Sequence, residues 1–499
     1  MSAQPNTINW HTRAASLAIR GQAFVDGKYV DAVSGATFDS INPASGKLLC
    51  KIASCDQADV DRAVANARAV FNKGSWSRLA PRRRKQILLK FADLIRKHAE
   101  ELALLESLDM GKPVGDALSV DMSASANCIQ WFAEAVDKMY DEVAPTGEDA
   151  LALVTREPVG VVAAIVPWNF PLLMASWKLG PALASGNSVV LKPSEKSPLT
   201  AIRVAALAVE AGIPAGVLNV VPGMGGTAGK ALALSMDVDC VAFTGSTRTG
   251  KMMLEYSGQS NMKRVWLECG GKSPNILLAD TPDVDRAATA AAYAIFFNQG
   301  EMCSAGSRLV VHESLKDRVL EKIAAIGRAL TPGDPLDPNT KLGAIVDRTQ
   351  LDTVLRYIDK GRSEGARVAF GGNQVRKETG GFFVEPTIFD GVRQSMTIAR
   401  EEIFGPVLST ITFRDVEEAV AIANDVSYGL AAAVWSRDIT TAHRVARALR
   451  AGTVYVNCYD ADDITVPFGG FKQSGNGRDK SLHAFDKYTE LKTTWVDLS

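Results

Sequence analysis

Residues 217–229 read VLNVVPGMGGTAG, an apolar strand that runs into a glycine-rich turn and the start of a helix. Residues 240–250, CVAFTGSTRTG, repeat this arrangement. Glycines let the backbone approach a phosphate closely, and helix N-termini supply free N–H donors and the positive end of the helix dipole. A single glycine-rich turn is weak evidence, but two at neighbouring strands indicate a dinucleotide site.

The sequence around these turns alternates short apolar strands with helices, which is typical of a parallel, doubly wound sheet. The predicted strands are Val159–Val166, Ser188–Leu191, Val217–Val221 and Cys240–Phe243, with helices over Leu199–Ala211 and Thr227–Leu234. Upstream, apolar residues at helical spacing predict an amphipathic helix over Asp56–Phe71 and a long one from Pro81 to near Gly111.

A second α/β run follows downstream. Its predicted elements are Asn275–Leu278, Asp283–Asn298, Arg308–Val311, Leu315–Leu330, Val407–Phe413, Val416–Ala423 and Thr440–Ala448. The chain of 499 residues exceeds the size at which a single core stops growing, so this run predicts a second domain of the same class. No Pro/Gly/Ser-rich linker separates the two runs, and we therefore expect a packed domain interface.

Bulk composition excludes several classes of function. The formal net charge is −1 and 46% of the residues are hydrophobic. The chain therefore has no net positive charge that would attract nucleic acid or a membrane surface. No apolar run reaches membrane-spanning length, and residues 1–30 lack the apolar core of a secretory signal. The seven cysteines form no C-x-x-C pair, which indicates a reduced, cytoplasmic protein. The five histidines show no metal-ligand spacing, so we expect no metal site.

Two short segments carry the chemistry. Residues 267–274, LECGGKSP, place Glu268 before a glycine pair, and residues 296–304, FFNQGEMCS, place Cys303 in a turn of small and polar residues. Taken singly, Cys303 could be a small buried hydrophobe and Glu268 a solvated turn residue. Together they supply a thiol that attacks a carbonyl and a carboxylate that activates water, the groups needed to form and hydrolyse a thioester.

These segments resemble the glutamate and cysteine signatures of the NAD(P)-dependent aldehyde dehydrogenases, and the resemblance extends from Asn42–Gly46 to Pro467–Gly475. It implies two doubly wound parallel-sheet domains and a small β flap. The NAD-binding domain would span residues 1–140 and 160–270, and the catalytic domain residues 271–480. Residues 141–159 and 481–499 would form strands that join subunits into a homodimer or homotetramer. The alternative is that Ala150–Thr155 and Tyr488–Trp495 are ordinary edge strands.

The resemblance also assigns catalytic roles. Residues 165–171, IVPWNFP, follow a predicted strand and match the family's oxyanion loop. Asn169, which could otherwise be a turn residue between two prolines, would bind the oxyanion together with the Cys303 N–H. Hydride would then pass to the nicotinamide, and Glu268 would activate the hydrolytic water. Related enzymes that pass the acyl group to coenzyme A typically lack this glutamate, so Glu268 favours hydrolysis.

Cofactor contacts follow from the same resemblance, although the common G-x-G-x-x-G fingerprint is absent in clean form. Lys192 and Glu195 would hold the adenine ribose. A carboxylate there repels a 2′-phosphate, which favours NAD over NADP. The positive charge of Lys192 could partly neutralise such a phosphate. The other expected contacts are Gly245 and Ser246 at the pyrophosphate, Gly225 and Gly229 beside the adenosine, Glu402 and Phe404 at the nicotinamide ribose, and Ile165, Val166, Pro167, Trp168, Phe243, Thr249, Cys269 and Gly270.

The expected substrate tunnel is lined by Phe170, Met174, Trp177, Met302 and Phe468, with the loop Asn457–Thr465 at its mouth. Its three aspartates, Asp460, Asp462 and Asp463, either form a solvated face or attract a cationic substrate tail. The segments around the tunnel are most similar to polyamine-pathway members that oxidise γ-glutamyl-γ-aminobutyraldehyde and ω-amino or guanidino aldehydes. The alternative is a broad aliphatic or betaine-aldehyde dehydrogenase.

Two other classes of protein fit less well. A crystallin-like structural protein on this fold would be expected to have a broken catalytic set, whereas Cys303, Glu268 and Asn169 are all present. A cysteine hydrolase without a cofactor would leave both glycine-rich turns unexplained.

Overall fold

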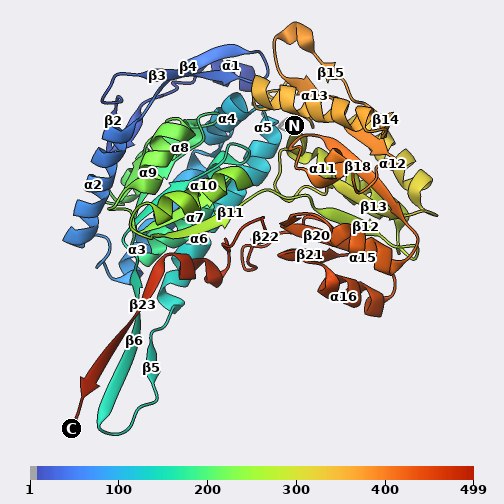
Figure 1. The fold of residues 1–499 in the computed structure, drawn as a ribbon. Coiled ribbons are helices and arrows are strands. Elements are labelled where there is room, and N and C mark those ends of the chain that lie inside the picture. Colours follow the sequence, from blue (N-terminus) through green and yellow to red (C-terminus); the bar gives the residue numbers. More distant parts are fainter. Residues whose placement is uncertain (1–7) are drawn as a thin grey trace, which may run out of the picture.

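The computed structural model describes residues 8–499. It contains two lobes, each built on a seven-stranded sheet with helices packed against it, and a three-stranded projection that extends from the first lobe (Figure 1).

The first sheet has the order β11-β10-β7-β8-β9-β1-β2 and is parallel from β11 to β9, with β1 and β2 antiparallel at one edge. Its strands are β11 Arg264–Glu268, β10 Cys240–Thr244, β7 Val161–Ile165, β8 Ser188–Lys192, β9 Leu218–Val220, β1 Ala23–Val25 and β2 Lys28–Val30. The strand order reverses between β7 and β10, and ligands of open α/β sheets bind beyond the carboxyl ends of the strands at such a reversal. Ile165 and Thr244 end the two strands there.

Helices cover this sheet and fill its core. They are α2 Gln57–Lys73, α3 Pro81–Lys97, α4 Ala99–Met110, α6 Ser123–Ala135, α7 Pro171–Ser185, α8 Leu199–Ala211, α9 Lys230–Leu234 and α10 Thr247–Gly258. Asp56 caps α2 through a capping box. The prediction of one long helix to Gly111 is wrong, because His98 (φ −102°, ψ 15°) ends α3 and precedes α4. The break leaves no mark in the apolar pattern. Every residue of α4 from Leu102 onward is buried, so apolar residues continue at helical spacing beyond His98.

Shorter elements complete the first lobe. These are α1 Trp10–Ser16, the ribbon β3 Thr37–Asn42 and β4 Lys47–Ala53, α5 Val114–Asp116, the short π-helix η1 Ala117–Met122, the 3-10 helix η2 Val136–Lys138 and the short π-helix η3 Gly225–Gly229. The predicted helix Thr227–Leu234 is therefore the end of a π-helix followed by α9.

The second sheet has the order β14-β17-β18-β13-β12-β20-β21, and all neighbours except the pair β14 and β17 are parallel. Its strands are β14 Arg367–Phe370, β17 Thr387–Asp390, β18 Val407–Phe413, β13 Arg308–His312, β12 Pro274–Leu277, β20 Ala431–Trp435 and β21 Thr453–Val456. The covering helices are α11 Val284–Phe296, α12 Lys316–Ala329, α13 Arg348–Ser363, α15 Val416–Asn424 and α16 Ile439–Ala448. The seven elements predicted in this half are present, whereas α13, β14, β17, β20 and β21 were not predicted.

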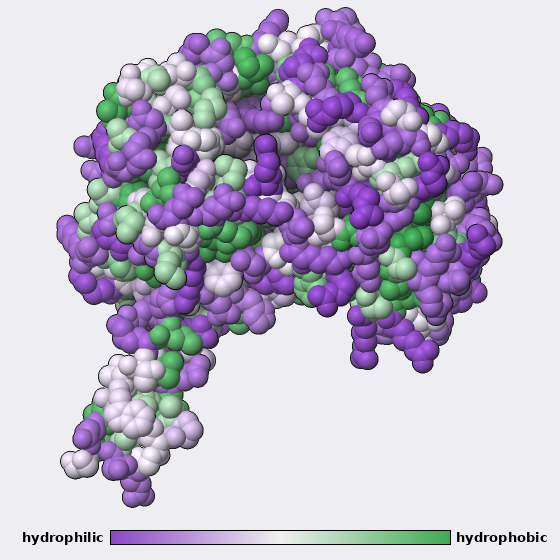
Figure 2. Space-filling view, viewed as in Figure 1, coloured by the Kyte–Doolittle hydropathy of each residue, from purple (hydrophilic) through white to green (hydrophobic). Residues whose placement is uncertain are grey.

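The projection consists of β5 Glu142–Ala144, β6 Ala150–Pro158 and β23 Thr489–Asp497. β6 and β23 pair antiparallel from Ala150 with Asp497 to Pro158 with Thr489, and they belong to neither domain sheet. Hydrophobic side chains are exposed on it, among them Val143, Leu491 and Trp495, and Figure 2 shows pale and green atoms there among the purple. The 3-10 helix η6 Leu482–Lys487 precedes β23 and lies against the first lobe, where Phe485 packs against Phe132 of α6, rather than in the projection. Joining of subunits through these strands stays a prediction.

No helix within residues 8–499 combines the length and apolar character needed to cross a membrane.

Candidate active site

Cys303 lies where two cavities meet. One cavity, of about 270 Å³, lies beyond the carboxyl ends of β7 and β10, and the other, of about 460 Å³, runs along α7 and α11. Cys303 and Met174 line both cavities. Cys303 is partly exposed as a residue, and because it lines both cavities it can be reached from either side.

A strained backbone presents the Cys303 segment. Asn298 (φ 48°), Gln299 (φ 57°) and Gly300 (φ 70°) are successively left-handed at the end of α11. Such conformations cost about 1–3 kcal/mol at a non-glycine residue and persist only where the surroundings fix them. A Cβ at Gly300 would lie 2.2 Å from the Gly405 carbonyl, which explains glycine there.

Asn169 is held against the same segment. Its Nδ2 donates to the Glu301 carbonyl at 2.9 Å, and Asn298 Nδ2 donates to the Asn169 carbonyl at 3.1 Å. Asn169 follows β7, is 3% exposed and lines the first cavity. The structure therefore brings the amide predicted for the oxyanion hole beside the chain that leads to Cys303.

Glu268 ends β11 and also lines the first cavity. It is 4% exposed, and neither carboxylate oxygen has a hydrogen-bond partner among the described residues. Burial, and then the negative charge of Asp479, raise the pKa of Glu268 well above its usual value. A buried carboxyl without protein partners is suited to hold and deprotonate a water molecule.

Sequence analysis missed a buried ionic cluster beside Glu268. Asp479 pairs with Lys178 of α7 through one oxygen and with Lys487 through the other. Burial opposes ionisation of Asp479, but the two lysines hold its pKa below the usual value. Both lysines also favour the charged form of Glu268. No local signal marks this cluster, because its members come together only in the folded chain.

The pKa of the Cys303 thiol is raised to about 12 by burial, followed by the charges of Glu402, Glu268 and Asp460. The thiol is therefore protonated at neutral pH in this arrangement. It becomes a nucleophile only when a base accepts its proton or a positive charge enters the neighbouring cavity.

The predicted cofactor residues fall into three groups. Those that line the first cavity are Pro167, Trp168, Gly245, Ser246, Cys269, Gly270, Glu402 and Phe404. Gly229 lies beside Lys192, whose Nζ is 3.2 Å from Glu195 Oε2, and Gly225 faces open space. Ile165, Val166 and Phe243 are buried behind the cavity, and Thr249 lies in the first turn of α10, where its N–H donates to Ser246 Oγ at 3.3 Å.

Residues of α13 complete this cavity and were missed from the sequence. Gln350, Thr353 and Tyr357 line it, together with Thr244 and Ile403. Gln350 Nε2 donates to the carbonyls of Ile403 at 3.1 Å and Phe404 at 2.8 Å. These bonds fix Phe404 in a left-handed conformation (φ 58°), with its ring 5.1 Å from that of Trp168.

All seven predicted substrate residues line the second cavity, namely Phe170, Met174, Trp177, Met302, Asp460, Asp462 and Phe468. Sequence analysis missed its tyrosines and one phenylalanine, which are Tyr293, Tyr455, Tyr459 and Phe297. Asp460 and Asp462 are exposed, so they mark the open end. Burial of its carboxyl group between the cavity walls, and then the negative charge of the neighbouring Asp462, raise the pKa of Asp460 to about 6. Asp463 does not line the cavity and instead accepts hydrogen bonds from Thr465.

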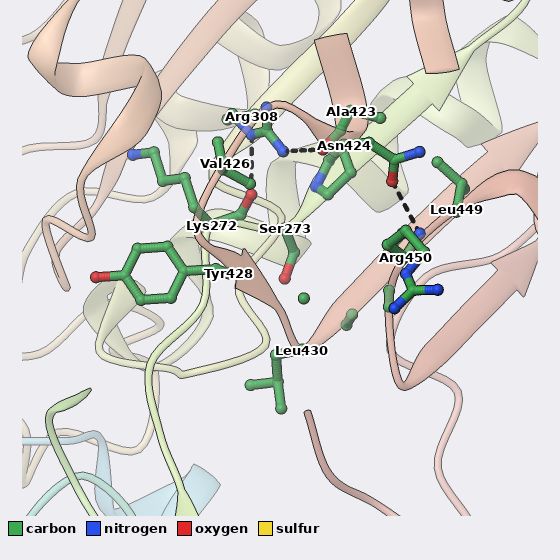
Figure 3. A pocket seen from close by; sticks show the side chains of 15 residues that line it. Lys272, Ser273, Arg308, Ala423, Asn424, Val426, Tyr428, Leu430, Leu449 and Arg450 are labelled. Atoms are coloured by element: carbon green, nitrogen blue, oxygen red, sulfur yellow. Dashed lines mark hydrogen bonds between the residues drawn. The ribbon is translucent and has the colours of Figure 1, made fainter. Parts of the chain in front are cut away.

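A smaller cavity of about 10 Å³ is lined by Lys272 and Arg308 among others (Figure 3), and neither Cys303 nor Glu268 lines it. Arg308 is fully buried and donates to the carbonyls of Lys272, Ile422 and Ala423 at 2.7–2.8 Å. The space holds at most one water molecule. This arrangement ties the chain that follows Glu268 to β13 and α15, and it has a structural role.

The family model that matches the chain is the aldehyde dehydrogenase family, over residues 29–494. The chain belongs to the aldehyde dehydrogenase family. This confirms the predicted family, its fold class and the enzyme class, an NAD(P)-dependent aldehyde oxidoreductase.

Individual relatives are similar over nearly the whole length. The NADP/NAD-dependent aldehyde dehydrogenase PuuC of Escherichia coli is 54% identical, with 98% of each chain covered. An indole-3-acetaldehyde dehydrogenase solved with NAD⁺ is 65% identical, with a TM-score of 0.97 over 98% of this chain and 99% of that one. A γ-glutamyl-γ-aminobutyraldehyde dehydrogenase from Burkholderia cenocepacia is 63% identical, with the same TM-score and coverage.

Proposed function

We propose that this aldehyde dehydrogenase oxidises aldehydes with an ω-amino, guanidino or γ-glutamylamino tail to carboxylic acids, with NAD as the cofactor. The observation that carries the proposal is the cavity that runs from Cys303 between aromatic walls to the carboxylate of Asp460. Aromatic faces and a carboxylate both attract a cationic group. The similarity to PuuC and to the γ-glutamyl-γ-aminobutyraldehyde dehydrogenase supports this substrate class.

In the proposed reaction, the Cys303 thiol first loses its proton to water, and the thiolate then attacks the aldehyde carbonyl from the second cavity. The Asn169 amide and the Cys303 N–H stabilise the resulting oxyanion, a contribution of about 10²–10³ in rate per donor. NAD bound in the first cavity supplies the hydride acceptor. Glu268 then takes a proton from water, which hydrolyses the thioester on Cys303 and releases the carboxylate product.

For the cofactor, the Lys192 and Glu195 pair supports NAD over NADP. In this proposal Glu195 accepts hydrogen bonds from the ribose hydroxyls and repels a 2′-phosphate. Lys192 Nζ lies 3.2 Å from Glu195 Oε2, so the positive charge of Lys192 is already paired and attracts a 2′-phosphate less. Replacement of Glu195 by Gln is expected to lower the ratio of kcat/KM with NAD to kcat/KM with NADP. An unchanged ratio would contradict this assignment.

A second substrate class is favoured by the aromatic lining itself. Phe170, Trp177, Phe297 and Phe468 offer flat apolar surfaces, and an arylacetaldehyde would stack on them. The similarity to an indole-3-acetaldehyde dehydrogenase supports this alternative.

The deciding experiment measures kcat/KM with NAD for γ-glutamyl-aminobutyraldehyde, 4-aminobutyraldehyde, 4-guanidinobutyraldehyde, betaine aldehyde, hexanal and indole-3-acetaldehyde. Our proposal predicts the highest value for an aldehyde with an amino, guanidino or γ-glutamylamino tail. The highest value for indole-3-acetaldehyde would establish the second candidate, and the highest value for hexanal or betaine aldehyde would contradict both.

We also propose that the enzyme is a cytoplasmic homodimer or homotetramer joined through β5, β6 and β23. The exposed Leu491 and Trp495 on these strands support this. Substitution of Trp495 by Glu is expected to lower the molar mass measured by light scattering, and an unchanged mass would contradict the proposed interface.

A further inference from the structure

We propose that Lys480 neutralises Asp462 at the mouth of the substrate cavity, so that Asp460 alone selects a cationic aldehyde tail. This inference deepens the proposed function and rests on it. It distinguishes two aspartates that both line the cavity and that sequence analysis treated alike.

Lys480 is a buried cation with a specific counterion. Its side chain is 2% exposed, and its Nζ forms an ion pair with Asp462 and donates to the Asp463 carbonyl at 3.1 Å. The same Nζ lies 5.6 Å from the ring centre of Trp177 and 5.8 Å from that of Phe468. The ammonium group therefore sits behind the aromatic wall of the cavity, held by one carboxylate and two ring faces.

The backbone around Lys480 is shaped to hold this position. Lys480 (φ 59°) and Ser481 (φ 49°) are both left-handed, which non-glycine residues adopt only when other contacts impose it. Ser481 N–H donates to the Ile464 carbonyl at 2.8 Å, and Asp479 exchanges two backbone hydrogen bonds with Phe468. These bonds tie the segment that carries Lys480 to the loop that carries the aspartates.

Asp460 has a different environment. Its carboxylate accepts one long hydrogen bond, from Ser304 Oγ at 3.5 Å, and forms no ion pair with any residue from 8 to 499. Ser304 adjoins Cys303, so the Asp460 carboxylate at the open end of the cavity is oriented toward the Cys303 segment. Its own backbone is left-handed (φ 56°), as expected of a side chain held in a required direction.

The charge at the cavity mouth follows from these contacts. Asp460 and Asp462 each contribute −1 and Lys480 contributes +1, which leaves a net charge of −1, and Asp460 is the aspartate without an ion-pair partner. Asp462 thus acts as the counterion of Lys480 and not as a contact for the substrate. Asp463, which lies outside the cavity, offers a matched control.

The test uses the selectivity ratio, defined as kcat/KM for 4-aminobutyraldehyde divided by kcat/KM for hexanal, with NAD at low ionic strength. Asp460→Asn is expected to lower this ratio about tenfold or more, the loss that follows removal of a hydrogen bond to a charged group. Lys480→Met is expected to raise it about threefold or more, because Asp462 becomes an unpaired anion, and salt is expected to reduce the increase. Asp463→Asn is expected to leave the ratio unchanged.

The decisive variant is the double substitution Lys480→Met with Asp462→Asn. It removes both charges and keeps Asp460, so the ratio is expected to stay within about twofold of the wild-type value. A fall as large as that of Asp460→Asn would show that Asp462 contacts the tail directly and would overturn the inference. An unchanged Tm and an unchanged circular dichroism spectrum establish that the variants fold.

A second measurement does not depend on Lys480 variants. Asp462→Asn alone leaves Lys480 unneutralised. Asp462 is 60% exposed, so the freed positive charge acts on the tail through the open cavity mouth, and the loss of selectivity is expected to shrink in about 0.5 M salt. The loss in Asp460→Asn is expected to persist, since it removes a direct contact. Persistence of both losses would overturn the inference.

Failure of the proposed function has a separate signature. If wild-type enzyme prefers hexanal to every cationic aldehyde, the proposed substrate class is wrong. The charge balance then stands if Lys480→Met still raises the ratio and the double variant restores it, and it fails if either change is absent.

Discussion

The carboxylate of Glu402 accepts a hydrogen bond from the Gly271 N–H at 2.9 Å, and its other oxygen lies 2.0 Å from the point that a Cβ at Gly270 would occupy. The glycine pair that follows Glu268 in sequence is therefore the surface on which Glu402 rests. Glu402 and Glu268 line one cavity, so a single turn positions both carboxylates around the cofactor region.

Substitution of Gly270 by Ala is expected to displace the Glu402 carboxylate and weaken NAD binding about tenfold or more, with little loss of stability, because the displaced atom ends a side chain and not a backbone. Calorimetric titration with NAD measures the change. Gly115→Ala, at a site where a Cβ meets nothing within 4 Å, is the matched control. Equal NAD affinity in both variants would contradict the role given to Glu402.

Glu402 also predicts a pH dependence of cofactor binding. Burial raises the pKa of Glu402 to about 7. Because the ionised form is the better acceptor for ribose hydroxyls, NAD affinity is expected to rise between pH 6 and pH 8 in the wild type. The rise is expected to be absent in Glu402→Gln, and a rise of equal size in that variant would assign the titration to another group.

Replacement of Glu268 by Gln is expected to lower kcat by about 10²–10⁴, since general base catalysis of hydrolysis is lost. The first turnover is expected to remain, so rapid mixing detects a burst of NADH and mass spectrometry detects an acyl group on Cys303. Because burial raises the pKa of Glu268 well above its usual value, hydrolysis in the wild type is expected to accelerate with rising pH at pH values above the usual titration range of a glutamate. Loss of the burst together with kcat would instead place Glu268 before hydride transfer.

Asn169→Ala is expected to lower kcat/KM by about 10²–10³ with unchanged NAD affinity, because it removes one donor to the oxyanion. Asn169→Asp keeps the shape of the side chain but places a carboxylate beside the developing negative charge. It therefore separates the contribution of side-chain shape from that of hydrogen-bond donation, and a loss of activity is expected here too. Near wild-type activity in either variant would remove Asn169 from the oxyanion hole.

Much of this architecture can be predicted from the sequence, because its parts are local. The Pro167–Phe170 loop follows β7 directly, the Gly245 turn follows β10, and Glu268 ends β11, so each site residue adjoins an apolar strand that marks its position. The carboxyl ends of parallel strands lie at one edge of a sheet, which brings these segments together.

Other features depend on tertiary contacts that have no local signal. Lys178 and Asp479 are 301 positions apart and meet only when η6 and the segment before it pack against α7. The predictions omitted α13, and with it Gln350 and its bonds to the Phe404 loop. The ion pair of Lys480 with Asp462 likewise joins two segments whose proximity is set by the backbone pairing of Phe468 with Asp479.

The most direct test of the central claim is a crystal structure of the Cys303→Ala variant with NAD and 4-aminobutyraldehyde. We expect the nicotinamide in the cavity lined by Glu268 and Glu402, the aldehyde carbon beside residue 303, and the ammonium group about 3 Å from the Asp460 carboxylate. An aldehyde that lies in the other orientation, or an ammonium group paired with Asp462, would contradict it.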